Sequence, residues 1–488
     1  MTIQLNDPGL FKTRAYINGE WLDSDSGATF SVTNPANGEQ LAEVASVGQE
    51  ETRRAIAAAE KAMQQWRQRP ANERAKLLRR WYELVMEHQQ DLAKLMTLEQ
   101  GKVLAESVGE VAYGASFIEW FAEEARRIYG DVIPLPQTDR RGVVIKQPVG
   151  VVAAITPWNF PNAMITRKAA PALAAGCAIV LKPAAETPLS ALALAELAER
   201  AGIPAGLFNV LPGENSREIG AELTSNPTVK KVTFTGSTPV GKTLMKQAAE
   251  TVKRTSMELG GNAPVIVFDD ADLDQAVAGA LVSKFRNSGQ TCICANRILV
   301  QDSVYDAFVE KLTTAVEAFR IGDGMASDST HGPVINAKAA NNIDSLVKQA
   351  VSQGATVVTG GRIDDQGECF YQPTILTNVT DQMRVFREEI FGPVAPVFRF
   401  STEEEAIAMA NDTEFGLASY LYTRDVGRVW RVSEGIEYGM VGVNEVAISA
   451  EMIPFGGVKE SGQGREGSKY GLDDYLEVKY ICMGGLQA

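Results

Sequence analysis

Apolar runs that alternate with helical segments dominate the chain from about residue 142 onward. The runs are Gly150–Ile155, Ala178–Leu181, Leu207–Leu211 and Lys231–Thr235, and the helical segments lie near 162–174, 188–201, 215–224 and 238–251. Strands that are buried on both faces and return through a helix pair in parallel. The pattern therefore predicts a doubly wound α/β domain, and a second alternating stretch from about 263 to 445 predicts another one.

The segments on either side of this alternation have different patterns. Residues 13–45 are typical of short strands with turns, and three long amphipathic helices are predicted near 49–66, 72–98 and 103–128. At the other end, residues 475–483 alternate between apolar and charged side chains. This tail predicts a strand without a neighbour close in sequence, and such an edge pairs with another part of the chain or with another subunit.

Composition excludes several classes of protein. A chain of 488 residues predicts two or three domains, and a net charge of −14 disfavours nucleic acid and anionic membranes as partners. The N-terminus shows no secretory signal, and the longest apolar stretch, 169–181, is too short to span a membrane. Five cysteines, an odd number, indicate a reducing cytoplasm rather than a disulfide framework. With only two histidines, we expect neither a histidine-based triad nor a metal site.

Residues 236–243, GSTPVGKT, match the phosphate-loop pattern of nucleotide hydrolases. A strand-like run precedes them, and the run that ends in Asp269-Asp270 has the form of a Mg²⁺-holding strand. One alternative is therefore a P-loop NTPase. Against it, Pro239 removes one of the backbone N–H groups that cradle phosphate.

Cys292 follows a turn of small and polar residues, Asn287-Ser288-Gly289-Gln290-Thr291. A structural cysteine usually sits in an apolar run, as Cys177 does. The surroundings of Cys292 suit an accessible nucleophile, which reacts as the thiolate. A packing role is the alternative.

Three polar residues stand where predicted strands end or turn. Glu258, followed by two glycines, is either a surface carboxylate or a general base, and a carboxylate must act as base where no histidine does. Asn159, held between Pro157 and Pro161, is either a helix cap or a rigid donor to an oxyanion. Lys182 is either a surface lysine or a ligand for a cofactor ribose or phosphate.

Seven motifs in one order carry a resemblance that covers nearly the whole chain. They are PWNFP at 157–161, KP at 182–183, FTGS at 234–237, ELGG at 258–261, GQTC at 289–292, EEIFGP at 388–393 and PFGG at 454–457. Together they resemble the NAD(P)⁺-dependent aldehyde dehydrogenase superfamily. The resemblance reassigns the glycine loop to the pyrophosphate of a dinucleotide at a helix N-terminus, which argues against ATP hydrolysis.

The resemblance implies a mechanism and a set of site residues. Cys292 attacks the aldehyde, the Asn159 amide and the Cys292 N–H hold the oxyanion, and Glu258 activates the water that hydrolyses the thioester. Lys182 completes this catalytic set, and it and Glu389 bind the cofactor riboses. The implied cofactor contacts are Ile155, Thr156, Pro157, Trp158, Lys182, Ala184, Ala185, Gly213, Phe234, Thr235, Gly236, Ser237, Leu259, Glu389 and Phe391.

Cofactor choice depends on the residue three positions after Lys182. An acid there would bind the ribose 2′-OH and repel a 2′-phosphate, but this chain has Ala185, with Glu186 one place later. We therefore expect NADP⁺ to be preferred and NAD⁺ to be used as well.

Two arginines suggest the substrate class. Arg167 lies about two helical turns after Asn159, and Arg286 lies six residues before Cys292. They are either solvated or form a clamp for a carboxylate, with Ser449 as a further donor and Phe455 beside it. The motifs around them resemble the succinate-semialdehyde branch of the superfamily, which implies a small anionic aldehyde as substrate. Glutarate semialdehyde, one methylene longer, is the close alternative, and a catalytically silent relative is a third reading.

Cys294 either packs in the interior or is a redox partner that forms a disulfide with Cys292. By resemblance, the chain divides into a cofactor domain (1–126 and 147–258), a catalytic domain (259–457) and a small β oligomerisation arm (127–146 and 470–488). The resemblance also implies a homotetramer or a homodimer.

Overall fold

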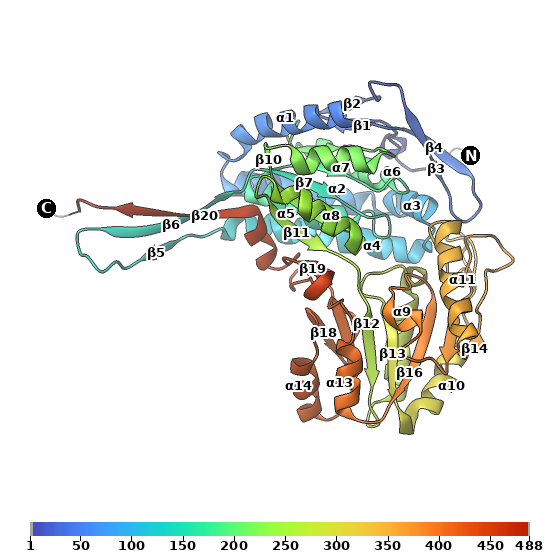
Figure 1. The fold of residues 1–488 in the computed structure, drawn as a ribbon. Coiled ribbons are helices and arrows are strands. Elements are labelled where there is room, and N and C mark those ends of the chain that lie inside the picture. Colours follow the sequence, from blue (N-terminus) through green and yellow to red (C-terminus); the bar gives the residue numbers. More distant parts are fainter. Residues whose placement is uncertain (1–2, 487–488) are drawn as a thin grey trace.

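Two large β-sheets, both mostly parallel, organise residues 3–486, the part of the chain that this computed structural model describes (Figure 1). This confirms the predicted α/β class with two doubly wound domains. The chain passes from the first sheet to the second directly after Glu258, where β11 ends, because β12 begins at Ala263.

The first sheet has eight strands. In spatial order they are β19 (Gly462–Gln463), β11 (Arg254–Glu258), β10 (Val229–Thr235), β7 (Val151–Ile155), β8 (Ala178–Lys182), β9 (Phe208–Val210), β1 (Ala15–Ile17) and β2 (Glu20–Leu22). The chain winds outward in both directions from the β7–β10 pair, which is parallel. A doubly wound sheet binds its ligand where the strand order reverses, so the carboxyl ends of β7 and β10 mark the expected site.

Eight helices pack around this sheet. They are α1 (Gln49–Trp66), α2 (Ala71–Glu87), α3 (Gln89–Gln100), α4 (Leu104–Glu124), α5 (Ala163–Ala175), α6 (Pro188–Arg200), α7 (Ser216–Ser225) and α8 (Thr238–Ala249). The single helix predicted over 72–98 is wrong, because the backbone of His88 leaves the helical region and separates α2 from α3. Apolar periodicity continues on both sides of that break, so the pattern did not reveal it.

The second sheet has seven strands, all parallel to their neighbours except the edge strand β14. In spatial order they are β14 (Thr356–Thr359), β15 (Thr374–Thr377), β16 (Val394–Phe400), β13 (Ala295–Gln301), β12 (Ala263–Val267), β17 (Ala418–Tyr422) and β18 (Met440–Val443). Its helices are α9 (Leu273–Phe285), α10 (Tyr305–Val316), α11 (Ala337–Ser352), α12 (Arg384–Arg387), α13 (Glu403–Asn411) and α14 (Val426–Gly435). A separate hairpin joins β3 (Thr29–Thr33) to β4 (Gln40–Ala45).

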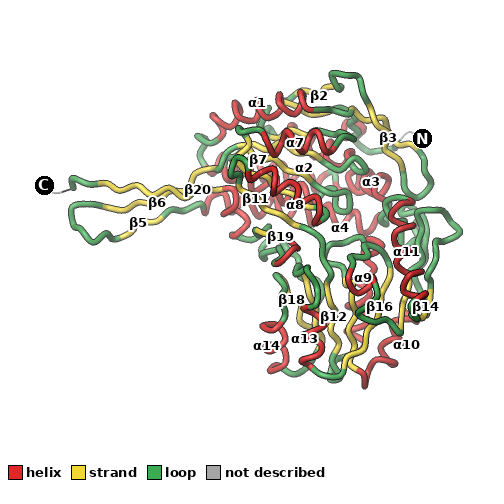
Figure 2. The backbone as a smooth tube through the Cα atoms, viewed as in Figure 1, coloured by secondary structure: helices red, strands yellow, loops and turns green. Residues whose placement is uncertain are grey.

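Three strands form an arm that projects from the body of the molecule, as Figures 1 and 2 show. The predicted tail strand is confirmed as β20 (Leu476–Met483), which pairs antiparallel with β6 (Arg141–Pro148), and β6 pairs in turn with β5 (Asp131–Ile133). The partner that the tail lacked nearby in sequence therefore lies more than 300 residues earlier. The domain boundaries given above remain a prediction.

The geometry of GSTPVGKT excludes a phosphate loop. Helix α8 already begins at Thr238, so Lys242 lies inside the helix, where it pairs with Glu460 at 2.6 Å. The strand that ends before Asp269-Asp270 belongs to the other sheet. Among residues 3–486, no helix is both long and apolar enough to cross a membrane.

Candidate active site

The active-site candidate lies between the carboxyl edge of the first sheet and the amino edge of the second. Ile155, Thr235 and Glu258 end β7, β10 and β11, and Cys292 lies just before β13 begins at Ala295. Two cavities meet here, because both are lined by Pro157, Trp158 and the segment 235–237.

The larger cavity is a groove of about 650 Å³ that suits a dinucleotide. Eleven of the predicted cofactor residues line it: Ile155, Thr156, Pro157, Trp158, Lys182, Ala184, Ala185, Phe234, Thr235, Gly236 and Ser237. Gly213 is buried and does not line it. A side chain at Gly236 would collide with the ring of Phe234, so glycine is required here and the groove is lined by bare backbone at this position. The groove fits the implied cofactor on these grounds.

Lys182 and Glu186 supply opposite charges to the same groove. The Lys182 ammonium donates to the carbonyl of Pro183 at 2.8 Å, and burial lowers its pKa to about 8, opposed by the Glu186 carboxylate. Glu186 is exposed, and position 185 holds an alanine rather than an acid.

The smaller cavity, about 230 Å³, connects this groove to the nucleophile. Its wall contains Cys292 and three more of the predicted cofactor residues, Leu259, Glu389 and Phe391. Trp158 and Phe391 meet edge to face with ring centroids 5.5 Å apart. The Glu389 carboxylate accepts from the Gly261 N–H at 2.9 Å, and burial raises the pKa of Glu389 to about 7.

A strained turn presents Cys292. Asn287, Ser288 and Gly289 have φ values of 52°, 53° and 74°, a run of three left-handed residues between α9 and the cysteine. Each non-glycine residue in that region costs about 1–3 kcal/mol. At Gly289 a side chain would also collide with the backbone at Pro393.

Hydrogen bonds hold this turn against Asn159. The Asn287 amide donates to the carbonyl of Asn159 at 3.0 Å, and the Asn159 amide donates to the carbonyl of Gln290 at 2.9 Å. An amide has two N–H groups, so Asn159 keeps one for a ligand. Among the described residues, no acceptor takes the N–H of Cys292. These two donors meet the requirement for an oxyanion hole.

Residues on and just before α4 hold both Asn159 and the turn that begins at Asn287 in place. The buried Lys102 ammonium bridges the Glu110 carboxylate at 2.5 Å and the carbonyl of Asn159 at 2.7 Å. Glu106, one helical turn before Glu110, accepts from the backbone N–H of Asn287 at 3.0 Å. The sequence reasoning missed all three, although a spacing of four residues places Glu106 and Glu110 on one face of α4.

The Cys292 thiol is neutral at neutral pH in this structure. Its side chain is partly accessible, but burial, with the nearby Glu258 next, raises its pKa to about 12. Arg167 and Arg286 act in the opposite direction and favour the thiolate. Cys292 lines the cavity, but the thiol is not acidic, and its role as the nucleophile stays a prediction.

Alkylation should therefore report this raised pKa. Only the thiolate reacts, so the rate with neutral iodoacetamide is expected to rise about tenfold per pH unit from pH 7 to 10, without a plateau. The measurement is the inactivation rate of the cofactor-free protein across that range. A plateau below pH 9 would mean that the pKa of Cys292 is near that of an ordinary thiol.

Glu258 belongs to a buried cluster of charged residues. Its Oε2 atom has no hydrogen-bond partner, and burial, then the charge of Glu466, raise the pKa of Glu258 well above its ordinary value. Glu466 pairs with Arg167 at 2.7 Å and with Lys168, which also donates to Thr235 at 2.6 Å. A general base that titrates well above an ordinary carboxylate is poised for proton transfer.

The structure modifies the predicted arginine clamp. Arg167 is only 1% exposed and already has Glu466 as a partner, a residue that the sequence reasoning missed although it stands alone as an acid in a glycine-rich segment. Arg286 is exposed, with its guanidinium 5.2 Å above the ring of Phe160. Phe455 is buried beneath the Arg167 guanidinium at 4.2 Å.

Cys294 packs behind the nucleophile rather than facing the cavity. It is buried, its thiol donates to the carbonyl of Lys284 at 3.1 Å, and both it and Cys292 are unpaired. The redox role suggested for Cys294 stays a prediction.

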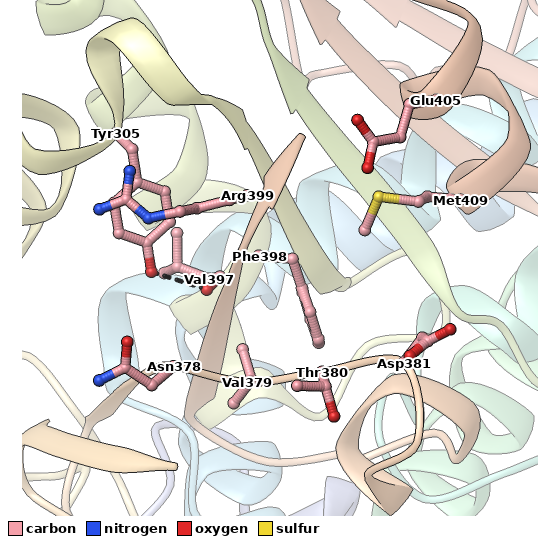
Figure 3. A pocket seen from close by; sticks show the side chains of 10 residues that line it. All are labelled: Tyr305, Asn378, Val379, Thr380, Asp381, Val397, Phe398, Arg399, Glu405 and Met409. Carbon is pink, nitrogen blue, oxygen red and sulfur yellow. Dashed lines mark hydrogen bonds between the residues drawn. The ribbon is translucent and has the colours of Figure 1, made fainter. Parts of the chain in front are cut away.

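A third cavity, about 350 Å³, lies in the second domain and shares no lining residue with the other two (Figure 3). Figure 3 shows the Arg399 guanidinium over the ring of Tyr305, at 3.7 Å, and the Tyr305 hydroxyl bonded to the carbonyl of Val397. No cysteine lines this cavity. Among the described residues, no group of three or more histidines, cysteines or acids is arranged to hold a metal.

Comparison with known proteins identifies relatives along the whole chain. A model of the Aldehyde dehydrogenase family matches residues 21–481. The glutarate-semialdehyde dehydrogenase of Pseudomonas aeruginosa is 62% identical over 484 residues, which cover 99% of this chain and 100% of that protein. The succinate-semialdehyde dehydrogenase (NADP⁺) of Escherichia coli is 61% identical over 482 residues, with 99% and 100% coverage.

Two further matches extend this comparison. The 3-sulfolactaldehyde dehydrogenase of Pseudomonas putida is 60% identical over 484 residues, covering 99% of each chain. Among solved structures, an NADP-dependent enzyme of E. coli superposes with a TM-score of 0.98 at 61% identity and covers 99% of this chain and 100% of its own.

Proposed function

Because this chain belongs to the aldehyde dehydrogenase family, we propose that it oxidises succinate semialdehyde to succinate, with NADP⁺ preferred over NAD⁺. One observation carries the substrate assignment: the Arg286 guanidinium lies 5.2 Å above the ring of Phe160, which lines the same cavity as Cys292, and the Arg167 guanidinium lies 4.2 Å above the ring of Phe455. A four-carbon aldehyde that ends in a carboxylate places an anion a few bonds from the carbon that Cys292 attacks. Paired guanidinium groups suit that anion.

The names of the relatives support an anionic substrate. Glutarate semialdehyde, 3-sulfolactaldehyde and succinate semialdehyde are all aldehydes with an acidic group at the far end. Glutarate semialdehyde remains the close alternative, because one methylene discriminates by only about 1–3 kcal/mol. A cationic aldehyde is disfavoured, since both arginines would repel it.

In the proposed mechanism, Cys292 gives its thiol proton to solvent and attacks the aldehyde carbon as a thiolate, the form that Arg167 and Arg286 favour. The oxyanion of the thiohemiacetal accepts from the second N–H of Asn159 and from the N–H of Cys292. Loss of a hydride from the thiohemiacetal carbon, which a bound nicotinamide would accept, leaves a thioester on Cys292. Glu258 then takes a proton from the water that attacks the thioester, and the carboxylate product leaves.

The cofactor assignment rests on the composition of the groove. Lys182, Ser237 and the backbone beside Gly236 offer cationic and polar groups for the pyrophosphate and ribose. Ala185 leaves space for a 2′-phosphate, although the exposed Glu186 lies in the same groove and weakens the preference.

The arm supports a proposal about assembly. Val132 on β5 and Val478 on β20 are 75% and 66% exposed, and a projecting sheet with apolar side chains and free edges is a typical association surface. We therefore propose a homodimer or a homotetramer that acts in the cytoplasm on a small anionic aldehyde.

The test compares succinate semialdehyde with butanal, which has the same carbon number and no charge. With NADP⁺, kcat/KM is expected to favour the acid by several hundred-fold, and Arg286→Ala should remove most of that preference. Equal values for the two aldehydes would leave the dehydrogenase chemistry standing and refute the substrate assignment. A strong preference for NAD⁺ in the same assay would refute the cofactor assignment.

A further inference from the structure

Tyr113, on α4, connects two residues of the proposed carboxylate site. Its hydroxyl lies 2.5 Å from the hydroxyl of Ser449 and accepts from the Arg167 guanidinium at 3.3 Å. The ring is held edge to face against Phe117, with centroids 5.1 Å apart and an interplanar angle of 87°. Three side chains from distant parts of the chain therefore form one hydrogen-bonded row.

This row contains more donors than acceptors. The bond between Tyr113 and Ser449 uses one of their two hydroxyl hydrogens, and because Arg167 can only donate, it cannot accept the other. Among residues 3–486, neither hydroxyl has another hydrogen-bond partner. The buried Nη2 of Arg167 also has none. The group that would complete this row is thus one that accepts several hydrogen bonds.

The charges around the row indicate the same kind of group. Arg167 and Lys168 are two buried cations that share one carboxylate, Glu466. Among the described residues, the other carboxyl group of the cluster, Glu258, forms no ion pair with either cation, and its Oε2 atom has no hydrogen-bond partner. A buried excess of positive charge is unfavourable until an anion offsets it. An ionised carboxylate satisfies both the donor and the charge requirements.

We propose that Tyr113 is a specificity-determining residue, whose hydroxyl orders Arg167 and Ser449 into one site for the substrate carboxylate. This inference rests on the proposed function and adds a residue that touches the substrate's anionic end through its hydroxyl. Removing the hydroxyl disconnects Ser449 from Arg167 and frees the Ser449 side chain to rotate, while Glu466 still holds the Arg167 guanidinium. The aldehyde end, at Cys292 and Asn159, is not affected.

The test is Tyr113→Phe, which removes one oxygen and keeps the ring against Phe117. For succinate semialdehyde, kcat/KM is expected to fall by about ten- to a hundredfold, the range for hydrogen bonds to a charged group. For butanal it should change less than about threefold. The effect should appear mainly in KM, and the inhibition constant of succinate, the product, should rise in parallel.

Ser449→Ala and the double variant test whether the hydroxyls act as one unit. If they do, the double variant should lose little more than the stronger single variant, since residues in one network are not additive. Tyr82→Phe is the matched control, because Tyr82 is half-buried on α2 and also lies beside an arginine, at 5.6 Å from Arg79. It should leave both substrates unchanged.

The outcomes separate this inference from the proposed function. If the unmodified enzyme prefers the acid but Tyr113→Phe affects both aldehydes equally, or neither, the role of Tyr113 is refuted and the proposed function stands. If the unmodified enzyme does not distinguish the two aldehydes, both fail. If the losses in kcat/KM of the two single variants multiply in the double variant, the two hydroxyls act independently, and the single hydrogen-bonded row is refuted.

Discussion

Replacing Cys292 by alanine is expected to lower kcat by at least about 10⁴-fold, the largest effect of any single change in this chain. The sulfur forms the covalent intermediate, and no second thiol lines the smaller cavity. Steady-state NADPH formation from succinate semialdehyde measures the loss. The variant should still bind NADP⁺, because Trp158 and the groove remain intact. Quenching of tryptophan fluorescence measures this binding.

Cys294→Ala is the matched control for this prediction. Cys294 is also unpaired but packs away from the cavity, so its replacement should cost less than about threefold in kcat. Activity retained in Cys292→Ala, or lost equally in both variants, would contradict the assignment of the nucleophile. If peroxide inactivates Cys294→Ala as reversibly as it does the parent, the disulfide role suggested for Cys294 is wrong as well.

Glu258→Gln should separate the two halves of the reaction. Without the base, hydrolysis of the thioester is expected to slow by about 10²–10⁴-fold, while the first hydride transfer still occurs. Rapid mixing with excess NADP⁺ and substrate should then show a burst of about one NADPH per active site, followed by a slow phase. A slow phase without a burst would mean that Glu258 acts in a step before hydride transfer rather than in hydrolysis of the thioester.

The pH profile of the unmodified enzyme gives a second readout for Glu258. The base is active only when ionised, and its pKa is raised, so the rate of hydrolysis should fall as the pH is lowered through a value well above that of an ordinary carboxyl group. The Gln variant should lack this acidic limb. If both enzymes show the same limb, another group is responsible.

The alternation of strands and helices was enough to predict the two sheets, because each strand is buried on both faces and connects locally through a helix. The break at His88 was not visible, since the helices on both sides keep their apolar periodicity. Motifs likewise placed Cys292, Glu258 and Asn159, whose neighbours in sequence determine the local turns.

Residues whose roles depend on distant partners were not predictable. Glu466 reaches Lys168 across 298 positions, and Tyr113 reaches Ser449 across 336. A tyrosine on an amphipathic helix and an acid in a glycine-rich loop have nothing in their own surroundings that indicates those contacts. The ion pair between Arg167 and Glu466 depends on the same long-range packing. The sequence therefore suggested a clamp of two free arginines, whereas in the structure one of them already has a carboxylate partner.

The ion pairs of Glu466 also have a consequence for how the protein is made. Arg167 and Lys168 are fully buried cations on α5, and their carboxylate partner is translated almost three hundred residues later. While the ribosome is still producing the second domain, the first cannot bury these charges without a large desolvation cost. We therefore expect the nascent first domain to keep this part of its core open to water until Glu466 has been made, so that the catalytic centre closes only after the second domain has been synthesised.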